Sequence, residues 1–261
     1  MLKRGVTVWN YPGDEIENGR IFHSLGFDAI SWLGSRFVAM EEDAAEAVAA
    51  FLRETGMTFT VHYALPDPEV PDKCREFERG IAFMRAWQQR HGLMAGLTFD
   101  VWYDLRQTLP YLAHALDVFR GLGAFLACED TPLNRRAMEQ YAKILKPGDD
   151  YGILVDTGHL NIRQYTLEMH EPEDFVEIFE KLPLPVRELH LHDNKGRKDD
   201  HRQYGFGNLP LDGVVEGLRR IGFGGIVSVE IVQQDWSRAQ GFEYAVQTRD
   251  AFFSRWDAPR R

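Results

Sequence analysis

The feature that most constrains this chain is a regular alternation of short apolar runs with longer amphipathic stretches. Eight runs rich in Val, Ile and Phe occur, at residues 6–10, 27–34, 58–63, 96–102, 124–130, 151–159, 186–194 and 225–231. A strand followed by a helix, repeated many times, is the pattern of a parallel sheet with helical crossovers. Eight such units favour closure of the sheet, so the sequence predicts an α/β fold with a (β/α)8 barrel.

The stretches between these runs predict the helices. Apolar residues recur at spacings of three and four over residues 43–55, 74–91, 105–122, 135–145, 172–182 and 211–221. Glycines suited to a left-handed helix C-cap stand near five of the ends, namely Gly56, Gly92, Gly123, Gly148 and Gly222. The first interval, about 18–25, predicts only one or two helical turns. The length of 261 residues is close to the roughly 250 typical of a one-domain barrel, which predicts a single domain over residues 1–261.

Charge and cysteine usage narrow the classes of function. A formal charge of −10 would repel the phosphate backbone of nucleic acid and favours small-molecule partners. No apolar run approaches the length of about 20 residues needed to cross a bilayer, and no cleavage signature follows the N-terminal residues. We therefore expect a cytoplasmic protein in which Cys74 and Cys128 are reduced thiols.

Ionisable side chains collect at the C-terminal ends of the predicted strands, where the loops of a barrel open into one pocket. Such positions are held by His62, Asp100, Glu129, Asp156, His190, His192 and Glu230. Buried carboxylates are costly unless they are paired or bind a metal, so their convergence predicts a shared divalent cation. Taken singly, His62 also fits a satisfied histidine, and Glu129 or Glu230 also fits an ion pair with an arginine.

Two motifs refine this picture. In VDTGH (155–159), Asp156 ends a strand and His159 follows in the turn, so both can face one pocket. In RELHLHDNKG (187–196), period two directs Glu188, His190 and His192 to one side. His192 then either contributes to function or hydrogen-bonds a loop, and the following Asp193 is expected to cap a turn.

On these residues the chain resembles the xylose-isomerase-like TIM barrel superfamily, which holds sugar isomerases, epimerases and endonuclease IV. The resemblance rests on VDTGH, HLHDNKG (190–196), DDHRQYGFGN (199–208) and VSVEI (227–231). It implies a metal-binding set of Glu129, Asp156, His190 and Glu230. In the epimerase branch the two glutamates also move protons on opposite faces of a ketose, and the residue matching His159 contacts the sugar. In the nuclease branch further ligands, supporting three zinc ions, match His62, His159, Asp199 and His201.

Two departures from the family pattern bear on function. Asp100 stands where the nuclease pattern has a histidine; an aspartate can also ligate zinc or manganese. Trp32 stands where sugar isomerases often carry a glutamate. Trp9, Trp32 and Trp102 lie near the ends of the first, second and fourth predicted strands, and they either form an apolar wall against a sugar or fill the top layer of the barrel. His62 is a further candidate substrate contact.

The sequence therefore predicts a metal-dependent isomerase or epimerase of a sugar, sugar phosphate or polyol, in which Glu129 and Glu230 transfer protons through an enediolate. The cation is expected to be zinc or manganese, with cobalt or magnesium as alternatives. The competing hypotheses are an endonuclease IV-like multi-zinc phosphodiesterase, a non-catalytic sugar-binding barrel, and lyase chemistry on the same enediolate. The resemblance also implies a homo-oligomer.

Overall fold

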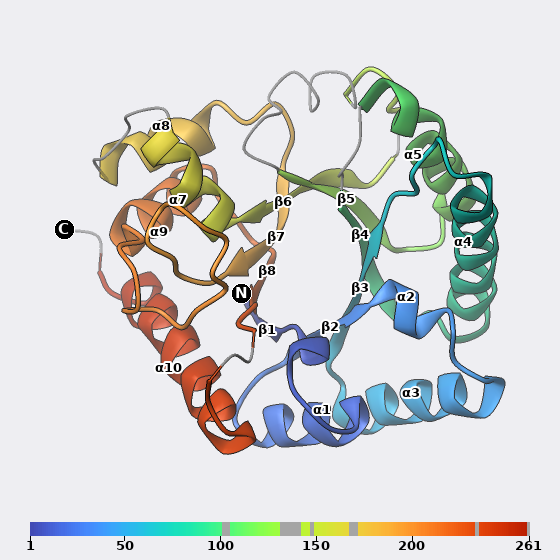
Figure 1. Cartoon of the computed structure of the whole chain (residues 1–261), viewed down its shortest axis with the longest axis horizontal. Coiled ribbons are helices and arrows are strands. Elements are labelled where there is room, and N and C mark those ends of the chain that lie inside the picture. The colour runs from blue at the N-terminus through green and yellow to red at the C-terminus, as the bar shows by residue number, and fades with distance from the viewer. Residues whose placement is uncertain (101–104, 131–141, 147–148, 167–171, 233–234, 260–261) are drawn as a thin grey trace.

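The computed structural model describes residues 1–100, 105–130, 142–146, 149–166, 172–232 and 235–259, and eight parallel strands form a barrel surrounded by helices (Figure 1). The strands are hydrogen-bonded in the order β1-β8-β7-β6-β5-β4-β3-β2. A parallel bridge between Thr7 and Ser31 joins the first strand to the second. The N–H of Asp28 also donates to the carbonyl of Arg4 at 2.9 Å. The predicted (β/α)8 barrel is therefore confirmed.

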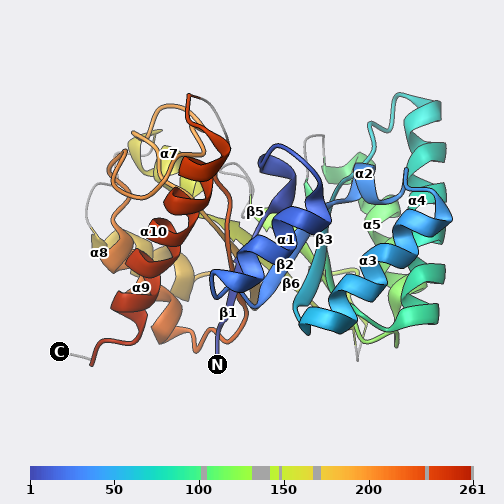
Figure 2. The ribbon, with the colours of Figure 1, turned by 90° about the horizontal axis from the view of Figure 1, so that it is seen from below.

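The strands are β1 (Lys3–Val6), β2 (Ala29–Leu33), β3 (Thr58–Ala64), β4 (Met94–Asp100), β5 (Phe125–Asp130), β6 (Tyr151–Asp156), β7 (Val186–Leu191) and β8 (Ile226–Val229). The helices are η1 (Val8–Asn10), α1 (Glu15–Ser24), α2 (Gly34–Phe37), α3 (Glu42–Thr55), α4 (Pro71–His91), α5 (Leu105–Phe119), α7 (Thr157–Thr166), α8 (Pro172–Glu180), α9 (Leu211–Arg220) and α10 (Arg238–Trp256). Figure 2 shows α7, which directly follows β6, near the end of the barrel opposite the two labelled termini. Among the described residues, no helix is both long and apolar enough to span a bilayer.

Two of the predicted C-caps illustrate how glycine ends the helices. Gly56 and Gly92 follow α3 and α4 with φ angles of 66° and 64°, and their N–H groups donate to carbonyls in the last helical turn. A residue with a Cβ adopts this left-handed conformation at a cost, whereas glycine does not. The predicted helix over 135–145 lies mostly outside the described residues, as does Gly148.

The first predicted strand is wrong in its position. The sequence pattern placed it at 6–10, whereas β1 spans Lys3–Val6 and residues Val8–Asn10 form the short helix η1. The N–H of Tyr11 closes this turn on the carbonyl of Val8 at 3.2 Å. Val6 and Val8 are both buried, a pattern that fits either a strand or a helical turn at residues 8–10. The strand ends where its pairing with β8 ends.

The first crossover is longer than predicted. Helix α1 has 10 residues and begins at Glu15, before the predicted start at about residue 18. Asp14 caps it, because its side chain accepts the N–H of Glu17 at 2.8 Å. An aspartate at the N-cap satisfies a donor that would otherwise lack a partner in the first turn.

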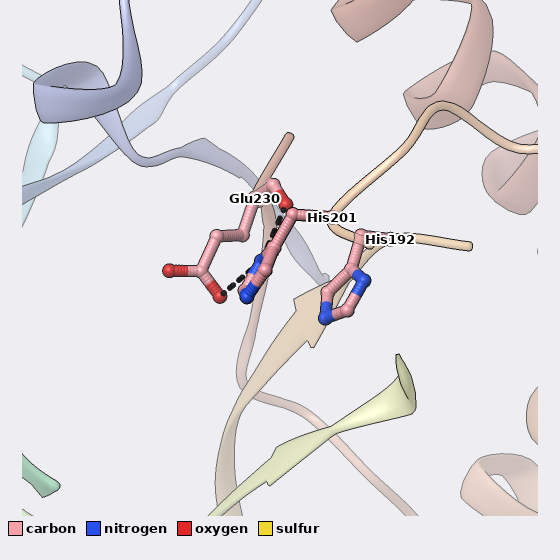
Figure 3. Close-up of side chains that lie close together, drawn as sticks. All are labelled: His192, His201 and Glu230. Atoms are coloured by element: carbon pink, nitrogen blue, oxygen red, sulfur yellow. Dashed lines mark hydrogen bonds and ion pairs between the residues drawn. The ribbon is translucent and has the colours of Figure 1, made fainter. Parts of the chain in front are cut away.

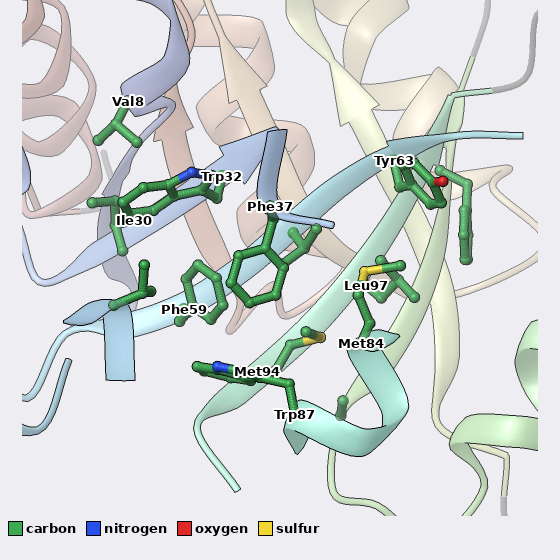
Figure 4. Close-up of a cluster of buried hydrophobic side chains, with 14 of the residues drawn as sticks. Val8, Ile30, Trp32, Phe37, Phe59, Tyr63, Met84, Trp87, Met94 and Leu97 are labelled. Carbon is green, nitrogen blue, oxygen red and sulfur yellow. The ribbon is translucent and has the colours of Figure 1, made fainter. Parts of the chain in front are cut away.

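Aromatic packing holds the helices on the barrel. Phe59 on β3 lies at the centre of a buried cluster with Trp32, Phe37 and Trp87 (Figure 4). Its ring centroid is 5.5 Å from that of Phe37 and 5.6 Å from that of Trp87. Such edge-to-face contacts join β3 to the short helix α2 and to α4.

Inside the barrel, beneath its mouth, the side chains are small and polar around one buried carboxyl. Glu188 is 0% exposed, and its Oε1 accepts from the Ser228 hydroxyl at 2.6 Å and from the Thr60 hydroxyl at 3.4 Å. A Cβ added at Gly5 would lie only 2.5 Å from Oγ of Ser228. This tightly packed layer lies beneath the side chains at the barrel mouth.

Replacement of Phe59 by alanine is expected to destabilise the protein by about 3–5 kcal/mol, because a large buried ring is lost and a cavity remains. Urea unfolding followed by circular dichroism measures this change. The control is Val70→Ala, since the Val70 side chain is exposed and its loss should alter stability by less than about 0.5 kcal/mol. Equal effects of the two substitutions would contradict the described packing.

Candidate metal centre at the barrel mouth

The four residues predicted to bind a cation stand at the C-terminal ends of four consecutive strands. Glu129 lies on β5, Asp156 ends β6, His190 lies on β7, and Glu230 directly follows β8. In the same order, these four residues are 7%, 0%, 0% and 7% exposed. The sheet register pairs Asp156 with His190. The fold therefore gathers buried carboxylates and an imidazole at one end of the barrel.

Donor atoms of these residues approach closely in two overlapping groups. Asp156, His190 and Glu230 form one group, and Glu129, Asp156 and His159 form another, with all donor atoms of each group within 4.8 Å of one another. Asp156 belongs to both. Nδ1 of His190 lies 2.9 Å from Oε2 of Glu230, yet neither ring nitrogen of His190 makes a well-oriented hydrogen bond with a described residue. A divalent cation fits this donor set of carboxylates and imidazole.

A third donor group adjoins the first two on the side of β3 and β4. Nε2 of His62 lies 3.1 Å from Oδ2 of Asp100 and 3.5 Å from Oε2 of Glu129. The hydroxyl of Thr98 lies 2.8 Å from Nδ1 of the same ring and fixes its orientation. His62, Asp100 and Glu129 can thus hold a second cation, with Glu129 shared between two groups.

The loop after β7 brings two more predicted residues to the mouth. Oδ2 of Asp199 lies 3.1 Å from Nε2 of His159 and 2.8 Å from Nε2 of His201. Nδ1 of His159 lies 2.9 Å from Oε1 of Glu129. His201 has a positive φ of 44°, a conformation that residues other than glycine adopt only at a cost. Figure 3 shows its imidazole lying between Glu230 and His192.

Two buried neighbours of the predicted ligands lie outside the ligand set that the resemblance implies. Nε2 of His192 lies 2.8 Å from Oδ1 of Asp156, and Oε1 of Glu188 lies 3.8 Å from Nε2 of His190. Both residues are 0% exposed. The period-two pattern of β7 was the available signal, since it places these two side chains on the same face as His190.

Asp193 has a wider role than the predicted cap of the next turn. Its carboxylate accepts the backbone N–H groups of Gly205, Gly207 and Leu209 at 2.9, 2.9 and 3.0 Å. A Cβ at Gly207 would lie 1.8 Å from the carbonyl oxygen of Asn194. The aspartate therefore ties down the far end of the loop that carries Asp199 and His201.

The aromatic residues divide between the pocket and the outer layer. The ring of Trp9 stacks on that of His62, with centroids 5.9 Å apart and planes 6° apart, so Trp9 lies beside the donor groups. The register pairs Ser31 with Thr60, which faces the interior, and pairs Trp32 with Val61. Alternation along the strands then turns Trp32, only 1% exposed, toward the helices.

The predicted substrate contact of Trp32 is consequently unsupported, because its ring packs in the outer hydrophobic cluster, 6.2 Å from that of Phe59. Trp102 lies outside the described residues. Of the two tryptophans that the structure describes here, Trp9 is the one beside the candidate metal centre.

The electrostatics of the mouth favour protonated imidazoles when no cation is bound. Burial lowers the pKa of His62, but the charges of Asp100 and Glu129 outweigh it and raise that pKa to about 10. Burial is likewise outweighed at His190, where Glu230 raises the pKa to about 9. Burial and the charge of Asp100 raise the pKa of Glu129 to about 8. A cation that bound these donors would displace their protons.

Comparison with known proteins identifies the family to which the chain belongs. Residues 20–251 match the family model described as xylose isomerase-like TIM barrel, and the chain belongs to that family. A segment of 125 residues is 30% identical to an uncharacterized protein, MJ1311, of Methanocaldococcus jannaschii; it covers 46% of this chain and 41% of that relative.

Solved structures share the fold over nearly the whole chain. An L-ribulose 3-epimerase superposes with a TM-score of 0.74 at 15% identity, covering 98% of this chain and 95% of the other. A D-tagatose 3-epimerase-like protein gives 0.72 at 18% identity, covering 97% of each chain. The D-psicose 3-epimerase of Clostridium cellulolyticum H10, solved with D-tagatose, gives 0.71 at 14% identity, covering 98% and 100%. At these identities the likeness establishes the fold alone.

A rise in pH is expected to destabilise the metal-free protein, whereas the binding of a cation is expected to stabilise the folded protein. The metal-free folded protein holds protons on His62, His190 and Glu129 that the unfolded chain releases at lower pH, so its stability should fall as the pH rises from about 5 to about 10. Cation affinity should rise over the same range, because the donors bind in deprotonated form. The lowered pKa values of Asp156 and Asp199 act below this window.

Thermal unfolding with a chelator and with excess Mn²⁺, recorded across this pH range, tests the expectation. The difference in Tm between the two series should widen as the pH rises. Two curves that stay parallel would show that the histidines and the cation do not compete at this site.

Proposed function

We propose that this protein is a divalent-metal-dependent isomerase or epimerase of a small carbohydrate. The observation that carries the proposal is that Glu129 and Glu230 stand in two donor groups that share Asp156. If a cation bound there, the two glutamates could serve as proton-transfer groups for a carbonyl substrate held beside it. Several structures with this fold are described as 3-epimerases of ketoses, which supports a ketose as the substrate class.

The chemistry requires a proton to leave a carbon next to a carbonyl and to return at another face or position. A bound cation would supply charge stabilisation for the oxygen atoms of the enediolate. Of the two glutamates, one removes the proton as a carboxylate and the other donates a proton as an acid. Glu129 and Glu230 are each 7% exposed, so both reach the mouth while water is largely excluded from their carboxyl groups.

The electrostatic environments of the two glutamates shift their pKa values in opposite directions. Burial and Asp100 raise the pKa of Glu129 to about 8, which favours its protonated form. Burial opposes ionisation of Glu230, but His190 outweighs it and holds the pKa of Glu230 below its ordinary value. Carboxyl groups whose pKa values are pushed apart can act as an acid and a base. In the metal-free protein this difference favours the protonated form of Glu129 and the ionised form of Glu230, and a bound cation would displace the proton of Glu129.

Residues beside the donor groups would bind and orient the sugar. His159 is partly exposed and contacts Glu129, which places its ring at the edge of the reacting centre. Trp9 offers an aromatic face beside His62, suited to the apolar face of a sugar ring. The combination of carboxylates with imidazoles suits zinc or manganese, with cobalt and magnesium as alternatives.

Replacement of either catalytic glutamate by glutamine is expected to abolish proton exchange. With Mn²⁺ bound, the unaltered protein should incorporate deuterium from deuterated water into a ketose substrate, as nuclear magnetic resonance detects. E129Q and E230Q should lower this rate by about 10²–10⁴-fold, because each removes an acid–base group. Both should also weaken Mn²⁺ binding, which calorimetry measures.

The matched control is Lys3→Gln, at an exposed residue at the start of β1. It should leave both the exchange rate and the Mn²⁺ affinity unchanged. Unaltered metal affinity and exchange in E230Q would mean that this glutamate is not part of the site. Strong metal and ketose binding without any exchange in the unaltered protein would favour a sugar-binding barrel instead.

A second candidate function, metal-dependent phosphoester hydrolysis, is favoured by one specific observation. His62, Asp100 and Glu129 form a donor group beside the first, and Asp199 lies within 3.1 Å of both His159 and His201. These residues offer enough ligands for a cluster of cations, as the resemblance to endonuclease IV implies. Clustered cations suit attack at phosphorus and stabilisation of a leaving oxygen.

The number of ions per chain separates the two candidates. For the epimerase we expect one tightly bound ion, located by anomalous scattering among Glu129, Asp156, His190 and Glu230. Elemental analysis of the purified protein measures the stoichiometry. Two or three zinc ions, reduced in number by D100N, would favour the phosphoesterase, and cleavage of DNA at abasic sites would then test it directly.

A further inference from the structure

His192 is a buried histidine that the proposed reaction does not use. Its side chain is 0% exposed, and its Nε2 lies 2.8 Å from Oδ1 and 3.0 Å from Oδ2 of Asp156. Its ring also stacks on that of His201, with centroids 4.1 Å apart and planes 20° apart (Figure 3). The imidazole is thus held against both oxygens of the carboxylate that the two donor groups share.

Three consecutive residues, the last of β6 and the first two of α7, lie against His192. Asp156 accepts from its ring, as described above. The hydroxyl of Thr157 donates to the carbonyl of His192 at 2.9 Å and accepts its N–H at 3.1 Å. A Cβ added at Gly158 would lie 1.9 Å from Cε1 and 2.6 Å from Nδ1 of the imidazole. Gly158 lacks a positive φ, so space for the ring, rather than backbone conformation, requires glycine here.

We propose that His192 is a positioning residue that orients the carboxylate of Asp156 toward the cation, and that Gly158 serves to admit its ring. This inference rests on the metal centre of the proposed function. Hydrogen bonds from outside the ligand shell orient metal-binding carboxylates, and their removal typically weakens metal binding by about 10–100-fold. The backbone N–H of His159 contacts Oδ1 of Asp156 alone at 2.8 Å, whereas Nε2 of His192 lies against both carboxylate oxygens.

Gly158 provides a second route to the same effect. An alanine there would favour helix α7 by its propensity, so any loss of metal affinity in G158A must come from the displaced ring. If the ring is the cause, alanine at 158 should cost nothing once His192 has itself been replaced. A double-mutant cycle therefore separates this link from an unrelated defect.

Co²⁺ is the probe, because its affinity and its visible absorption bands are measured on the same samples. H192A and G158A should each weaken Co²⁺ binding by about 10–100-fold, and the double variant should bind as H192A does. H192Q, which keeps an N–H donor, should retain more affinity than H192A. The shape of the Co²⁺ bands should stay unchanged in all variants, since no ligand is lost.

The controls are Gly224→Ala, where an added Cβ meets no heavy atom within 4 Å, and His23→Ala, at an exposed histidine. Both should bind Co²⁺ as the unaltered protein does, and thermal unfolding without metal verifies that each variant folds. Should H192A fail to fold, H192Q with and without G158A carries the same comparison.

Three results would overturn the inference alone: unchanged affinity in the His192 variants, additive losses in the double variant, or altered Co²⁺ bands that mark His192 as a direct ligand. If the unaltered protein bound no Co²⁺, the proposed metal centre would fail and this inference with it. The two failures are therefore distinguished by the first titration.

Discussion

Burial of the Asp156 carboxylate is the constraint on which the rest of the candidate site depends. The residue is 0% exposed at the centre of the barrel mouth. An ionised carboxylate there is stable only with compensating charge and hydrogen bonds. Imidazoles on α7 and just after β7 provide them: burial raises the pKa of Asp156, but the charges of His159 and His192 outweigh burial and hold that pKa low. The same arrangement leaves donors that a cation can take over once the imidazoles release their protons.

The barrel can hold these buried charges because its apolar outer layer, between strands and helices, is separate from its polar interior. Aromatic residues such as Phe59 and Phe37 join strands to helices on the outside, where apolar burial stabilises the fold. Inside, small residues close the space around Glu188, and the candidate metal ligands stand at the C-terminal ends of the strands. The apolar contacts that stabilise the fold and the polar contacts of the site therefore lie on opposite faces of the same strands.

The strands and several residues of the candidate site could be predicted from the sequence, because apolar runs mark the strands and ionisable residues mark their C-terminal ends. Asp156 and His190 were placed correctly at strand ends by that argument. Trp9 was expected near the end of the first strand, but that strand was placed too late, and the residue lies on η1, with its ring stacked on that of His62. The contact between His192 and Gly158 could not be predicted from the sequence. It joins positions 34 residues apart and depends on the space beside a glycine.

The remaining question of function turns on His62 and its neighbours. Its ring stacks on Trp9 on one side and approaches Asp100 and Glu129 on the other. If Asp100 mainly holds His62 protonated, the ring is a cationic wall of a one-metal sugar pocket. If a second cation displaces that proton, the same three residues become a ligand set and the pocket gains a positive centre suited to phosphate. Asp100, which stands where the nuclease pattern has a histidine, therefore favours the one-metal site. Its carboxylate raises the pKa of His62, so a proton competes more strongly with a second cation for that ring.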